Sequence, residues 1–145
     1  MIVHDASLIW HVKDFFGFRT FTPFEETLLK ELQNRLCEEN SLALRSQIKR
    51  FIRCGRLLKA IPYRVGSYGY TELYMRKNDS TFSPFNMDEE IKVIASSLVI
   101  FDGGEIKVTF TQFEKRLFMI KYTGNKKTYY PPRKKYKLTK FEVFI

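Results

Sequence analysis

The sequence has 145 residues, of which 44% are hydrophobic and 28% charged, and its formal net charge is +9. This is the usual length of one domain, and such a domain buries about 68–70% of its unfolded surface without needing disulfides. The longest apolar run, Leu98–Phe101, is far shorter than the about 20 apolar residues of a membrane-spanning helix, which excludes that class of protein.

Metal-ligating residues are few and badly spaced for zinc. The chain has two cysteines and two histidines, and no C-x2-C pair occurs. We therefore expect no metal site and no cofactor, with Cys37 and Cys54 as reduced, mostly buried thiols. Residues 1–20 lack the basic start, apolar run and cleavage site of a secretory signal. A cytoplasmic protein without a membrane partner is the expectation.

The first predicted element is a helix that begins in residues 22–25, TPFE. Here the threonine can cap the helix, the proline suits the first helical position and the glutamate suits the third. Apolar residues then recur at intervals of four from Phe24 to Leu36, which predicts a helix with one buried face that runs to about Glu38. A second, shorter helix is predicted from Ser41. Residues 21–54 are thus expected to form a helical part.

Residues 56–123 combine alternating polar and apolar stretches with turn sequences, a pattern typical of an antiparallel sheet. After a first strand at residues 70–77, the clearest elements in chain order are residues 90–101, the turn Asp102-Gly103-Gly104, residues 106–111, the turn Gln112–Lys115 and residues 116–122. Because the connections are short, these strands should form a meander. We expect the N-terminal helices to pack on one face of the sheet, giving an α+β fold of two layers in a single domain.

The C-terminal segment, residues 124–145, is basic and aromatic. It contains seven lysines and arginines and one acid, Glu142, so it carries +6 of the net charge of +9. Its last residues are partly apolar, so we expect this basic tail to dock on the domain as an edge strand. One interpretation of its lysines is purely structural, since lysines on an edge strand oppose edge-to-edge aggregation.

A second interpretation of the tail is that it binds a partner. Basic groups attract acidic surfaces, and tyrosine and arginine are enriched among binding hot spots. The candidate partner contacts are Tyr129, Tyr130, Arg133, Lys134, Lys135, Tyr136 and Lys137. The same residue types could neutralise phosphates and stack on bases, which makes nucleic acid an alternative partner. No sequence motif of a nucleic-acid-binding fold accompanies them.

Catalytic patterns do not stand out in the sequence. The acidic residues Asp88-Glu89-Glu90 are adjacent, so successive side chains should point in different directions in a solvated loop. No phosphate-binding glycine motif occurs either. We expect no catalytic residues and a non-enzymatic protein, with catalytic groups from distant positions as the alternative.

The order of elements resembles that of small bacterial immunity proteins of contact-dependent inhibition and polymorphic toxin systems. The resemblance rests on residues 22–29, TPFEETLL, on the second helix with Ser46-Gln47-Ile48, and on the meander with its Asp102-Gly103-Gly104 turn. It implies a cytoplasmic, single-domain, non-enzymatic inhibitor that binds and blocks a cognate toxin domain, often a nuclease. Many such inhibitors are acidic, whereas this chain is basic, so its toxin would need an acidic surface or a binding site away from the tail.

Overall fold

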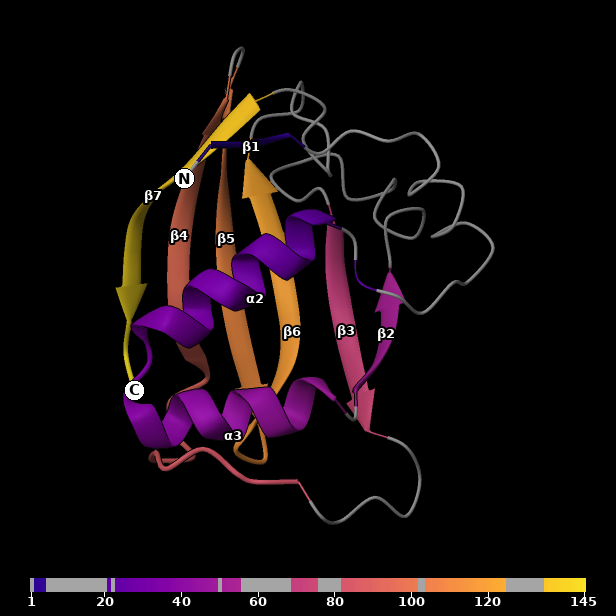
Figure 1. Ribbon diagram of the computed structural model, residues 1–145, viewed down its shortest axis with the longest axis vertical. Helices are drawn as coiled ribbons and strands as arrows, with labels where there is room; N and C mark the ends of the chain where they lie inside the picture. Colours follow the sequence, from indigo (N-terminus) through magenta and orange to yellow (C-terminus); the bar gives the residue numbers. More distant parts are fainter. Residues whose placement is uncertain are drawn as a thin grey trace.

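The computed structural model describes residues 2–4, 21, 23–49, 51–55, 69–75, 82–101, 104–124 and 135–145 (Figure 1). In these parts of the chain, two helices lie on one face of a seven-stranded sheet. The elements are β1 (Ile2–His4), α2 (Pro23–Arg35), α3 (Glu38–Ile48), β2 (Phe51–Gly55), β3 (Gly69–Met75), β4 (Val93–Phe101), β5 (Gly104–Phe113), β6 (Arg116–Gly124) and β7 (Lys135–Val143). The predicted two-layer α+β fold is confirmed.

The strands follow the order β1-β7-β4-β5-β6-β3-β2, and each neighbouring pair is antiparallel. The predicted meander is therefore present as β4-β5-β6. Its second turn is shorter than predicted, because Phe113 already pairs with Arg116. Glu114 and Lys115 form this two-residue turn with φ angles of 53° and 60°, as the turns favoured in hairpins require. Asp102 and Gly103 of the first predicted turn lie outside the described residues.

Helix α2 covers the sheet through the apolar stripe that the sequence predicts. Phe24, Leu28 and Leu32 are all 0% exposed. The helix ends at Arg35, three residues before the predicted end, and Leu36 just beyond it is still buried. These side chains meet the inward-facing residues of the central strands, so the core lies between the two layers.

The predicted helical part extends too far at its C-terminal end. Helix α3 ends at Ile48, and Phe51–Gly55 form strand β2, which pairs with β3 along its whole length. Residues 21–54 are therefore not entirely helical. The spacing of Leu44, Ile48 and Phe51 fits a helix, but the ladder with β3 decides the outcome, since a strand's stability depends on its neighbours more than on local propensity.

The described part of the basic tail, residues 135–145, docks on the sheet, but only some of it lies at an edge. Strand β7 lies between β1 and β4, and β1 pairs only with Lys135, Tyr136 and Lys137. Beyond Lys137, no described strand pairs with the outer side of β7. The end of the tail is anchored by apolar side chains, because Leu138 and Phe141 pack against the core.

Three buried amide side chains fasten the segment at residues 82–92 to both layers. Gln47 of α3 donates to the carbonyl of Ser83 at 2.9 Å and accepts from the Leu117 amide at 2.9 Å. Asn40 accepts from the Asn86 amide at 2.8 Å. Gln112 of β5 donates to the carbonyls of Glu89 and Ile91 at 3.0 and 2.7 Å. Gln47 thereby ties helix α3 directly to strand β6.

Replacing Gln47 with alanine should destabilise the protein. The Leu117 amide and the Ser83 carbonyl would lose a buried partner, which typically costs about 1–3 kcal/mol. The measurement is the free energy of unfolding from urea denaturation, with exposed Asn34→Ala of α2 as the control, expected to change it by less than about 0.5 kcal/mol. Equal effects of the two substitutions would contradict this role of Gln47.

Replacing Lys115 with glycine should stabilise the protein. A side chain in the left-handed region costs about 1–2 kcal/mol, whereas glycine adopts this region freely at a smaller cost in unfolded-chain entropy. We expect a gain of roughly 0.5–1 kcal/mol in the free energy of unfolding. Lys49 is the matched control because its φ is −64°, so Lys49→Gly should destabilise. A loss of stability in Lys115→Gly would refute the argument.

Candidate binding surface

Helices α2 and α3 both lie on one side of the central strands, so the other face of the sheet carries no described helix (Figure 1). On β5, Ile106, Val108 and Phe110 are buried toward the helices, and the residues between them are exposed or half-buried. The side chains of the alternate positions therefore form the opposite face. We call this the outer face, and its residues on four strands are Ser96, Leu98, Ile100, Glu105, Lys107, Thr109, Thr111, Met119, Lys121, Thr123, Lys137, Thr139 and Glu142.

Two apolar side chains of the outer face have charged neighbours on the adjacent strands. By register, Ile100 lies between Lys137 and Glu105, and it is 43% exposed. In the next row, Leu98 lies between Thr139 and Lys107. Exposed apolar groups framed by charged groups are the usual anatomy of a protein-binding patch.

Of the tail residues predicted to contact a partner, the structure brings Lys135 and Lys137 to the surface of β7. The prediction that Tyr136, which lies between them, contacts a partner is wrong. It is 1% exposed, and its ring lies 5.0 Å from the ring of Phe24 in an edge-on arrangement. The reason is the two-residue period of a strand, which sends neighbouring side chains to opposite faces. Tyr129, Tyr130, Arg133 and Lys134 lie outside the described residues.

Sequence reasoning missed the lysines that the sheet adds to this surface. Lys107 of β5 and Lys121 of β6 are exposed on the outer face, and they lie in different strands from the tail. The alternation of Ile106, Lys107 and Val108 was the available signal. This alternation predicts that Lys107 points away from the core. It does not predict the sheet order, in which β7 lies beside β4.

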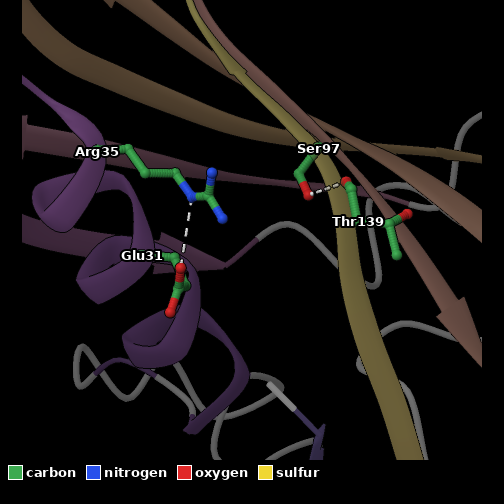
Figure 2. A network of polar contacts seen from close by, with 4 residues as sticks. All are labelled: Glu31, Arg35, Ser97 and Thr139. Carbon is green, nitrogen blue, oxygen red and sulfur yellow. Dashed lines mark hydrogen bonds and ion pairs between the residues drawn. The ribbon is translucent and has the colours of Figure 1, made fainter.

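A bulge in β7 interrupts the outer face. Ser96 pairs with Glu142 and Leu98 pairs with Thr139, so Lys140 and Phe141 together stand opposite Ser97. The Ser97 hydroxyl donates to the Thr139 carbonyl at 2.9 Å, as Figure 2 shows. In turn, the Thr139 hydroxyl donates to the Leu98 carbonyl at 3.0 Å. Two side chains thus hold the bulge in place.

The two residues of the bulge take opposite directions. Phe141 turns toward the helices, where its ring lies 5.8 Å from that of Phe110 and 5.0 Å from the guanidinium carbon of Arg35. Glu31, one turn earlier on α2, holds that guanidinium with an ion pair of 3.5 Å (Figure 2). Lys140 remains exposed, with a φ of 47°. The bulge therefore leaves a lysine on the surface in a left-handed conformation.

Beside the bulge the outer face is hollowed into a shallow depression of roughly 250 Å³. The residues that line it come from three strands and include two lysines and one acid: Ser96, Ser97, Leu98, Lys107, Lys140 and Glu142. Pockets that enclose drug-sized ligands measure about 300–1,000 Å³. This depression suits a single side chain rather than a cofactor.

The surface also carries the acidic segment at residues 88–90 and the thiol of Cys37. Asp88, Glu89 and Glu90 are exposed next to one another, as expected of a solvated segment. No three cysteine, histidine, aspartate or glutamate side chains within the described ranges approach closely enough to hold a metal ion. Cys37 is an exposed free thiol, so the expectation that it would be buried is wrong. It lies just before α3, outside the apolar stripe.

Arg116 has a structural role beside the β5–β6 turn. It donates to the Leu73 carbonyl at 3.1 Å, which ties β6 to β3, and its guanidinium carbon lies 5.9 Å from the Phe118 ring. Burial lowers the pKa of the Arg116 guanidinium, and the nearby Glu114 carboxylate partly offsets this effect. Because an arginine pKa starts so high, the group stays charged.

Neither helix of the described chain is long and apolar enough to cross a membrane. No protein-family model matches the sequence, and searches of curated proteins and of solved structures found no match. The function therefore has to be argued from the outer face itself.

Proposed function

We propose that this protein is a non-enzymatic binding protein of the immunity type, which binds and blocks a cognate bacterial toxin domain in the cytoplasm. The observation that carries the proposal is the outer face, where Leu98 and Ile100 are framed by Lys107 and Lys137 and no described helix covers them. The toxin-directed part of the proposal is supported by the order of the helices and the meander.

The mechanism is steric occlusion by a preformed surface. The outer face belongs to β7, β4, β5 and β6, which are tied together by continuous ladders. The backbone of such a frame loses little conformational freedom on binding, so ordering it opposes association only weakly. The apolar side chains supply the buried centre, and the lysines speed the encounter with an oppositely charged surface.

The charge of the outer face indicates the charge that a partner surface should carry. Its lysines outnumber its acids, and Lys135 adds a further positive charge at the start of β7. The partner should therefore present an acidic patch around an apolar centre. This accounts for a basic inhibitor, since an acidic toxin surface is then the complementary one.

Nucleic acid is the second candidate because the same lysines could neutralise phosphates. Binding of single strands also uses aromatic rings on which bases stack. Tyr136 is in the core, and the rings of Phe113 and Phe118, 6.0 Å apart, lie beside the β5–β6 turn at one end of the strands. By register, the rows through Leu98 and Ile100 carry aliphatic, lysine, glutamate and threonine side chains instead of aromatic rings, which favours a protein.

The test is capture of partners from the native host with the full chain as bait, at low and high salt, with and without nuclease. We expect one stoichiometric protein, identified as a toxin domain, that survives nuclease treatment. The double variant Lys107→Glu/Lys121→Glu should weaken its binding at least 100-fold, because two attractive charges become repulsive.

The matched control is Lys30→Glu/Lys49→Glu, which makes the same change in net charge on the exposed side of the helical layer. It should change the affinity less than threefold. Equal losses in the two double variants would mean that the outer face is not the binding surface. Recovery of nucleic acid that disappears at high salt would replace the protein partner with the second candidate.

A further inference from the structure

Lys140 occupies a backbone conformation that is costly for a lysine. Its φ of 47° lies in the left-handed region, which is unfavourable for a residue with a side chain and is usually occupied by glycine or asparagine. Its side chain is exposed and forms no ion pair with any residue that the structure describes. The Lys140 side chain itself therefore gains neither burial nor an ion pair within the described fold.

The surrounding structure holds Lys140 in this conformation. The Ser97 hydroxyl donates to the Thr139 carbonyl at 2.9 Å and the Thr139 hydroxyl donates to the Leu98 carbonyl at 3.0 Å, so both bonds lie where the bulge begins. Phe141, the residue after Lys140, packs against the core. Strained residues that their surroundings over-determine are concentrated at binding and catalytic sites.

The bulge also brings Lys140 to the depression on the outer face. There it shares the lining with Lys107 of β5, with the Ser96 hydroxyl and with Glu142. The two ammonium groups and the hydroxyl are hydrogen-bond donors for an anion. Neither ammonium group has an ion-pair partner among the described residues.

We infer that this depression is the anchor site for a carboxylate side chain, an aspartate or glutamate of the acidic partner. The inference rests on the proposed function and names the group that the outer face recognises. Lys107 and Lys140 bind the carboxylate from β5 and β7, and Leu98 contacts the methylene groups of the incoming side chain. Glu142 adds a negative charge to the lining, which disfavours the higher charge of a phosphate group.

The test uses the full chain, labelled with ¹⁵N, and a hexaglutamate peptide as the probe in an NMR titration at low salt. We expect saturable shifts centred on Ser96, Leu98, Lys107 and Lys140. Hexaglutamine should produce no such shifts, and inorganic phosphate should compete at least tenfold more weakly than the peptide. Shifts distributed equally over Lys30 and Lys49, or phosphate that competes as well as the peptide, would overturn the inference.

Lys140→Gly separates the charge from the backbone conformation. Glycine keeps the left-handed φ, so this variant should raise Tm while weakening hexaglutamate binding at least fivefold. Lys140→Arg keeps the charge and should bind within twofold of the original chain. Lys115→Gly is the matched control, since Lys115 has a φ of 60° in the β5–β6 turn, and it should raise Tm with unchanged affinity.

The outcomes for the anchor site and for the proposed function are distinct. If Lys140→Gly binds hexaglutamate and the captured partner as well as the original chain does, the anchor site is wrong, while sensitivity of that partner to Lys107→Glu/Lys121→Glu still supports the function. If the peptide binds at the depression but only nucleic acid is captured from the host, the anion site stands and its assignment to a protein partner fails.

Discussion

The alternation of side chains along the central strands governs both the stability of this protein and the surface it can use. Ile106, Val108 and Phe110 of β5 face the helices, so Lys107 and Thr109 must face away from them. A shift of one residue in register would exchange the two sets and bury the lysines. The core beneath α2 and the lysine-bearing outer face are therefore two consequences of one register.

Polar contacts at the end of the sheet where β5 turns into β6 stabilise this register. Gln112 accepts from the Lys115 amide at 2.9 Å within the turn, and Gln47 reaches from α3 to the Leu117 amide at the start of β6. If either strand slipped, a buried amide side chain would lose its hydrogen-bond partners, which is unfavourable. These contacts therefore oppose a change of register in either strand. Helix α3 thus contributes to the position of the outer face without touching it.

The bulge in β7 shows how a local departure from regular pairing can create a binding feature. One extra residue turns Phe141 inward, where it contacts Phe110 and Arg35, and leaves Lys140 outside. The packing of Phe141 stabilises the fold, whereas the left-handed backbone conformation of Lys140 destabilises it. The balance of these two effects allows the strand to carry a strained cation beside the depression, and the same bulge helps to make the end of an edge strand a poor template for pairing.

The sequence by itself determined the features that depend on local pattern. The stripe from Phe24 to Leu36 specified the buried face of α2, and alternation specified the strands of the meander, because side-chain periodicity is a local property. Only the tertiary structure decided that residues 51–55 pair with β3, that Tyr136 is core and that Lys140 and Lys107 line the same depression. These outcomes arise from contacts between segments far apart in the chain. The free energy of such a contact depends on both segments, so the local sequence of one of them does not determine it.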